Sequence, residues 1–182
     1  MQDRSVRLHL SPLLLAVATL LVAAGVAVGG KMYLNRSADL KHHVDGTSAW
    51  IPHAFLFSLA VVGIIVIILQ RGAAAAVRLL LAPLSVSAVQ RLTVTVRSAL
   101  RHPTALLRIV GSLLPIAILL YSPFRMGMQI LGGLDPNFTA NAWGGPGYLG
   151  AMACHYLDGV LLMAAAAYLL NLLLMRATPE DA

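Results

Sequence analysis

Four long apolar stretches divide the chain, and each is long enough to cross a lipid bilayer. They cover about 12–30, 52–69, 107–124 and 149–175. A helix rises about 1.5 Å per residue, so ~20 residues cross the ~30 Å of hydrocarbon in a bilayer. The pattern predicts an all-α integral membrane protein, with four transmembrane helices forming a bundle and one domain covering residues 1–182.

A connector at 71–105 separates the second and third apolar stretches. Arg78 and Pro83 interrupt its apolar part, and an arginine at a helix centre costs about 2.5–3.5 kcal/mol in a membrane. We therefore expect no fifth span. Apolar residues recur at intervals of three and four, opposite a polar face, at Val86, Val89, Leu92, Val96 and Leu100. This spacing predicts an interfacial amphipathic helix, which either tethers helices 2 and 3 or also has a regulatory role.

Composition supports a membrane protein without a separate soluble domain. Hydrophobic residues make up 59% of the chain and charged residues 11%, whereas soluble domains carry about 25% charged residues. The first apolar stretch follows two arginines and also resembles a signal peptide, but we interpret it as a retained first span.

The basic residues predict an orientation. With four spans, nine arginines fall on the side of the termini and the connector, and four basic residues fall on the other side. The positive-inside rule then places both termini in the cytoplasm, in a plasma membrane. Arginine outnumbers lysine 11 to 2, a composition typical of a bacterial source. The net charge of +6 indicates contact with anionic lipids, not nucleic acid, and the candidate headgroup ligands are Arg91, Arg97 and Arg101.

Two ionisable residues lie inside the fourth predicted span. His155 and Asp158 are three positions apart, so they share one face of a helix. Asp158 lies about 13 Å from the start of the span at Leu149, too deep for a short carboxylate to reach water. Its candidate partners are His155, Arg125 at the outer end of span three and His53 at the start of span two. We expect His53, Arg125, His155 and Asp158 to form an outward-facing polar cluster.

This cluster admits three interpretations. In the first, an ion pair or a protonated Asp158 fastens the fourth helix to its neighbours. In the second, His53 and His155 hold a metal ion or a haem, with Asp158 orienting one imidazole ring. In the third, Asp158 and His155 form a proton or cation relay.

Histidines in the first outer loop form a further candidate site. His42 and His43, with His53 and His155, are potential copper or zinc ligands, because imidazole suits both ions. Their spacing matches no recognised metal motif, and adjacent histidines in a polar loop are usually solvated.

Helix contacts and loop positions can also be predicted. Gly25 and Gly29 form a small-residue face for close helix packing, and we expect the small-residue face of the fourth span to be its partner. Trp143, in the glycine-rich second outer loop, suits the aromatic belt at the headgroups. The alternative is that this loop folds over the polar cluster as a lid.

No catalytic motif is present, such as a phosphate-binding glycine loop, a nucleophile elbow, CxxC, HExxH or CxxCH. An enzyme is therefore not the expected class. The favoured hypothesis is a non-catalytic membrane subunit or binding protein that assembles with other membrane proteins or with itself. The alternatives are a small oligomeric proton- or cation-coupled transporter and a metal- or haem-binding redox subunit.

Overall fold

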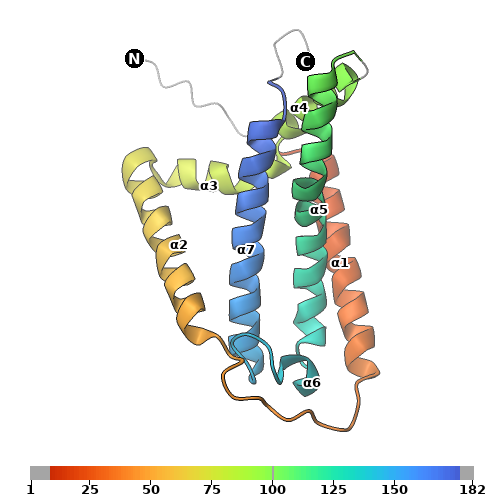
Figure 1. The fold of residues 1–182 in the computed structure, drawn as a ribbon, viewed down its shortest axis with the longest axis vertical. Coiled ribbons are helices and arrows are strands. Elements are labelled where there is room, and N and C mark those ends of the chain that lie inside the picture. The colour runs from red at the N-terminus through yellow and green to blue at the C-terminus, as the bar shows by residue number, and fades with distance from the viewer. Residues whose placement is uncertain (1–8, 100, 177–182) are drawn as a thin grey trace.

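The computed structural model describes residues 9–99 and 101–176, which fold into helices joined by turns (Figure 1). In chain order the elements are α1 (Pro12–Leu34), α2 (Trp50–Arg71), α3 (Ala73–Leu81), the 3-10 turn η1 (Ala82–Leu84), α4 (Val86–Ala99), α5 (Pro103–Gly132), α6 (Pro136–Thr139) and α7 (Tyr148–Leu173). Helices α1, α2, α5 and α7 are long and apolar enough to cross a membrane. The predicted fold class, an all-α membrane bundle with four transmembrane helices, is confirmed.

The two ends of the bundle carry different segments of the chain (Figure 1). We call one the loop end: it carries the first loop, 35–49, and the second loop, 133–147, which contains α6. We call the other the terminal end: it carries α3, η1 and α4, together with both ends of the described chain. The polar cluster predicted from the sequence lies toward the loop end.

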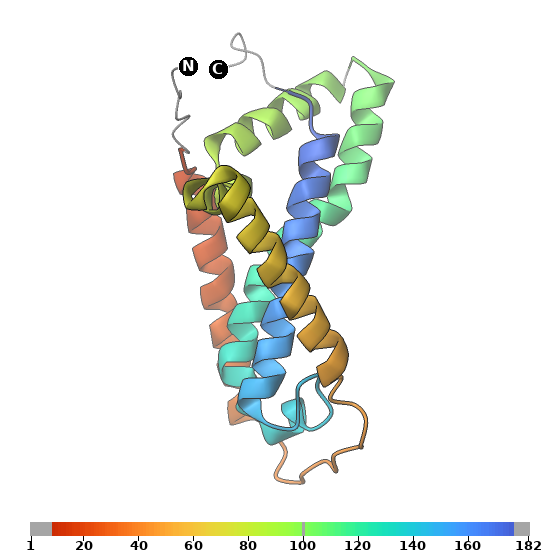
Figure 2. The same ribbon diagram turned by 90° about the vertical axis from the view of Figure 1, so that its left-hand side faces the viewer.

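Helices α1 and α5 pack backbone against backbone (Figure 2). A Cβ atom added to Gly25 or to Gly29 would lie 2.0 Å from a carbonyl oxygen of α5. A Cβ atom added to Gly127 of α5 would lie 2.2 Å from the Val22 carbonyl oxygen of α1. The predicted role of Gly25 and Gly29 in close packing is therefore confirmed, but the predicted partner is wrong. The sequence pattern predicts that α1 packs on the fourth span, α7. In the structure α1 and α7 each pack on α5.

Helix α5 is longer than the predicted third span, which ends near residue 124. It continues unbroken through Pro115 and Pro123 to Gly132. The last two turns are enclosed by protein on more than one side, since Gly127, Gln129 and Gly132 are all buried. Polar residues there face neighbouring helices, so mean hydropathy underestimates the length of the span.

The connector forms the amphipathic helix expected from the sequence, α4, and a further helix, α3, but α4 turns a polar face to the bundle. Thr95 is fully buried, and its hydroxyl oxygen accepts a hydrogen bond from the backbone N–H of Met175 at 3.0 Å. The predicted apolar stripe is partly exposed, with Val86 at 37% and Val96 at 49%. These valines are free to face lipid. Leu100, the last member of the stripe, lies outside the described residues.

A short backbone contact joins the connector to the start of α1. Leu10 and Ser85 form an isolated antiparallel bridge. The backbone N–H of Ser11 donates to the Leu84 carbonyl at 2.8 Å, and that of Val86 donates to the His9 carbonyl at 2.9 Å. The connector is thus fixed to the terminal end of α1 as well as to α7.

Helix α2 is the transmembrane helix with the least protein around it. His53 is its single buried residue. From the loop end, α2 diverges from α7, and α3 then runs back across the terminal end toward the bundle (Figure 1). The attachment of α2 to the other transmembrane helices is therefore concentrated around His53.

Candidate functional site

The two loops at the loop end are joined by two asparagine side chains. The Asn137 amide accepts a hydrogen bond from the Lys41 N–H at 2.7 Å and donates one to the Asp39 carbonyl at 2.9 Å. Four residues later, the Asn141 amide accepts from the Val44 N–H at 2.8 Å. Each amide therefore bonds to the backbone of the first loop, and together they hold the first loop against the second.

A second contact brings the start of α2 to the start of α7. The Gly144 N–H donates to the Ser48 carbonyl at 2.6 Å. Gly144 has a φ of +79°, and a Cβ atom there would lie 2.1 Å from the Gly150 carbonyl oxygen. Only glycine satisfies both the conformation and the space at this position. The tip of the second loop is thus pressed onto the chain just before α2.

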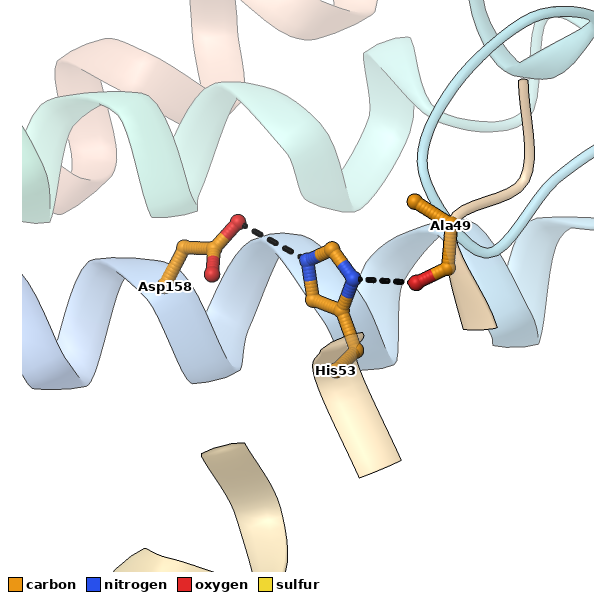
Figure 3. Close-up of polar contacts among 3 residues, drawn as sticks. All are labelled: Ala49, His53 and Asp158. Atoms are coloured by element: carbon orange, nitrogen blue, oxygen red, sulfur yellow. Dashed lines mark hydrogen bonds and ion pairs between the residues drawn. The ribbon is translucent and has the colours of Figure 1, made fainter. Parts of the chain in front are cut away.

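His53 and Asp158 meet beneath this loop contact (Figure 3). The His53 Nε2 lies 3.2 Å from the Asp158 Oδ2, and the His53 Nδ1 lies 2.7 Å from the Ala49 carbonyl oxygen. The side chains of His53 and Asp158 are 7% and 24% exposed. Trp143 covers the imidazole, with ring centroids 5.4 Å apart. Of the three partners considered for Asp158, the structure selects His53, and Trp143 lies on the cluster as the lid alternative requires.

The geometry fixes the number of protons in this pair. A carbonyl oxygen only accepts, so the His53 Nδ1 must carry a hydrogen and donate it to Ala49. The contact between Nε2 and the Asp158 carboxyl group needs one further proton, which belongs either to the ring or to the acid. Either way the pair is neutral overall and shares one proton. A charge buried without a partner is thereby avoided.

A pocket of about 810 Å³ lies next to the pair, between α2, α5, α7 and the second loop. Arg125 and Gln129 of α5 line it, together with His155 and Asp158 of α7. The remaining lining is largely apolar and includes Leu56, Met126, Leu161 and Leu162. Three of the four residues of the predicted cluster therefore share one pocket, and the fourth, His53, is bonded to it through Asp158.

Gln129 is the unusual member of this pocket. It is 1% exposed, and its Nε2 has no hydrogen-bond partner in the part of the chain that the structure describes. A buried donor without a partner costs about 1–3 kcal/mol, and buried amides in proteins are nearly always bonded. The wall of the pocket therefore contains a buried N–H donor that lacks an acceptor among the described residues.

The predicted metal ligands lie in different environments. No three His, Cys, Asp or Glu side chains in 9–99 and 101–176 are grouped closely enough to share a metal ion. The His43 Nδ1 donates to the Ala140 carbonyl at 2.6 Å, and His42 lies exposed in the first loop. A haem between His53 and His155 would need the His53 Nε2, which already contacts Asp158. Of the predicted metal ligands, only His53 and His155 belong to the polar cluster.

The arginines assigned to lipid headgroups have different environments. Arg97 and Arg101 are exposed at the terminal end. Arg91 instead donates hydrogen bonds to the last carbonyls of α7, at 2.7 Å to Asn171 and Leu174. Its main role is thus to cap α7, a role that the sequence pattern of α4 does not reveal.

Sequence reasoning missed Gln129 and the two asparagines of the second loop. A signal for Gln129 exists: Ser122, Arg125 and Gln129 follow one another at intervals of three and four, which places them on one helix face. Reading the third span through to Gly132 would have exposed this polar stripe. Asn137 and Asn141 are four apart, but nothing in their spacing identifies the backbone that they bind.

Comparison with other proteins leaves the site to be interpreted from its geometry. No protein-family model matches the chain, and neither a curated protein nor a solved structure gives a match.

Proposed function

We propose that this chain is a non-catalytic membrane binding protein that takes an amphipathic ligand into the pocket beside His53 and Asp158. The observation that carries the proposal is the buried, unpartnered Nε2 of Gln129. A ligand oxygen that accepts this N–H would remove the cost of the unbonded donor. Pockets of this kind, apolar with a few convergent polar groups, are typical of small-molecule sites.

The lining indicates the kind of ligand. Arg125 contributes a positive charge, and the His53–Asp158 pair is neutral overall, so the pocket favours an acceptor-rich or anionic group. Leu56, Leu161 and Leu162 suit an apolar portion of the same molecule. The proposed ligand therefore has acceptor oxygens at one end and a hydrocarbon part at the other.

Assembly with other membrane proteins, or with a second copy, is part of the same proposal. Helix α2 has a single buried residue, and Phe55 and Phe57 are 63% and 59% exposed. Such a helix has room for a neighbour along most of its length. We place both termini in the cytoplasm of a bacterial plasma membrane on the basis of the arginine distribution. The pocket then opens toward the outer leaflet.

Replacing Gln129 with methionine tests the proposal, because the two side chains are similar in size and only the amide is lost. We expect Gln129→Met to raise the free energy of unfolding of the ligand-free protein by about 1–3 kcal/mol, since no buried donor remains unbonded. We also expect the variant to lose a small molecule that co-purifies with the wild type. Native mass spectrometry after gentle purification measures the second effect, and also reveals any bound subunit.

Gln70→Met is the matched control, because Gln70 is exposed on α2 and far from the pocket. It should change neither stability nor ligand retention. A Gln129→Met variant that is less stable than the wild type and keeps the same bound molecules would show that the amide has a purely structural role.

Proton-coupled transport is a second candidate, supported by the single proton shared between His53 and Asp158. Ionisable residues inside membrane spans commonly form proton pathways. The proton lies next to a pocket that reaches the loop end, and either residue of the pair can hold it.

Proton flux into liposomes, followed with a pH-sensitive dye, tests this candidate. Transport requires flux by the wild type and its reduction to the level of empty liposomes in Asp158→Asn, because an amide cannot release a proton. Asp39→Asn removes the same charge from an exposed loop residue and should leave the flux unchanged. Equal flux in all three samples excludes Asp158 as a relay.

A further inference from the structure

A second pocket lies at the terminal end and shares no lining residue with the first. It has a volume of about 940 Å³ and lies between α4, the start of α5 and the end of α7. Its charged side chains are Arg91, Arg108 and Arg176, and His102 also lines it. Among residues 9–99 and 101–176, no aspartate or glutamate is part of this lining. The pocket is thus strongly basic.

Two of these arginines also cap α7. Arg91 donates hydrogen bonds from its Nε and both terminal nitrogens to α7 and to the residues after it. The bond from Nε reaches the Met175 carbonyl at 3.1 Å. Arg108 donates from Nη1 to the Leu173 carbonyl at 2.9 Å. A guanidinium group has five N–H donors, so Arg108 keeps most of its donors for another acceptor. The α7 terminus therefore holds both side chains in place, using most of the donors of Arg91 but only one bond from Arg108.

The positive groups repel one another. Burial lowers the pKa of Arg91 below its usual value, and the nearby charge of Arg176 lowers it further. Within 9–99 and 101–176, no carboxylate lies within ion-pair distance of any of the three arginines. A bound anion would offset this repulsion.

The rest of the lining combines polar residues with an apolar part. Leu172 lies in the pocket wall and is 57% exposed, and Ala105 and Met175 are also in the lining. A free inorganic anion would gain nothing from these groups. A molecule with a phosphate and a hydrocarbon chain would use both kinds of surface.

We propose that the pocket between α4, α5 and α7 binds the phosphate headgroup of an anionic phospholipid from the leaflet at the terminal end. Arg108 and Arg176 bind the phosphate, while Arg91 positions the end of α7 beside it. The lipid thereby fastens the connector to the transmembrane bundle. This site differs from general attraction of the connector to anionic lipid, which would depend equally on Arg97 and Arg101.

Lipid retention by the full chain in native mass spectrometry tests the proposal, with phosphatidylglycerol or phosphatidylcholine added at equal concentration. The wild type should retain one phosphatidylglycerol and show higher thermal stability with it. The double variant Arg108→Gln/Arg176→Gln should bind it about 25-fold more weakly, from about fivefold for each basic residue near a headgroup. Arg97→Gln/Arg101→Gln removes the same charge outside the pocket and should retain the lipid.

Further variants separate a binding defect from a folding defect. Arg176→Gln alone leaves the α7 caps in place and should weaken binding about fivefold, and Arg108→Lys should largely preserve it. Equal losses in the two double variants would overturn the proposal in favour of a diffuse basic surface. Stabilisation by inorganic phosphate as strong as that by phosphatidylglycerol would assign a soluble anion instead. A last outcome is that the lipid binds only after Glu180→Gln/Asp181→Asn. That result would overturn the proposal, because it would mean that the acidic residues of the chain occupy the basic pocket in the wild type.

Discussion

Substituting alanine for Gly25 is expected to separate α1 from α5 and to lower the free energy of unfolding by about 3 kcal/mol, the upper part of the usual range for overpacking. The added Cβ would lie 2.0 Å from a backbone carbonyl oxygen. A flexible side chain could move aside, but this oxygen belongs to the backbone of α5. Relief therefore requires a shift of one whole helix. Reversible unfolding in mixed micelles, followed by circular dichroism, measures the loss.

Gly127→Ala should behave similarly, because its Cβ would lie 2.2 Å from the Val22 carbonyl oxygen on the same interface. The double variant Gly25→Ala/Gly127→Ala should lose less than the sum of the two, since one separation of the helices relieves both contacts. Gly63→Ala is the control: nothing lies within 4 Å of a Cβ there, and alanine favours helix by about 1 kcal/mol over glycine. If Gly25→Ala proves as stable as Gly63→Ala, the close packing of α1 on α5 is incorrect.

Removal of either partner in the His53–Asp158 pair is expected to release α2 from α7. Breaking a fully buried pair costs about 3–5 kcal/mol, and we expect about 2–3 kcal/mol here because Asp158 is 24% exposed. His53→Leu and Asp158→Leu should each show this loss. The double variant should lose less than their sum, because two leucines leave no polar group unbonded. The expected coupling energy is about 1.5–2 kcal/mol, near the top of the range for polar pairs between membrane helices.

A second double-mutant cycle controls for the preference of leucine for hydrocarbon. His155 lines the same pocket as Asp158 but makes no hydrogen bond to it among the described contacts. The cycle of His155→Leu with Asp158→Leu should therefore give a coupling energy near zero. Equal coupling in both cycles would mean that Asp158 acts through the general electrostatics of the cluster, and that His53 is not its specific partner.

Hydropathy predicted the four spans because hydrocarbon tolerates few polar groups facing lipid. It failed at the end of α5, where Arg125 and Gln129 face other helices and the pocket. An average over all faces of a helix cannot separate lipid-facing from protein-facing positions. The pairing of α1 with α5 could not be predicted either. The spacing of Gly25 and Gly29 predicts close packing, but small-residue faces occur on both α5 and α7, and the sequence does not say which of them is the partner.

The site was predictable in its residue types but not in its connections. The burial of Asp158 requires some partner, and sequence supplied His53 among three candidates. The choice depends on where α2 begins, which is set by the contact of Gly144 with Ser48 and by the asparagine bonds to the first loop. These are contacts between segments about 100 residues apart. No local pattern encodes them.

The asparagine bonds at the loop end have a consequence for sequence variation. The side chains of Asn137 and Asn141 bond to peptide groups of 37–44 in the first loop, and within that segment His43 is the side chain that bonds back to the second loop. Because these bonds are made to the backbone, they place no requirement on the other side chains of this segment. Homologous chains are therefore free to vary most side chains of this part of the first loop. The amides of Asn137 and Asn141 would still hold the loop in place over the His53–Asp158 pair.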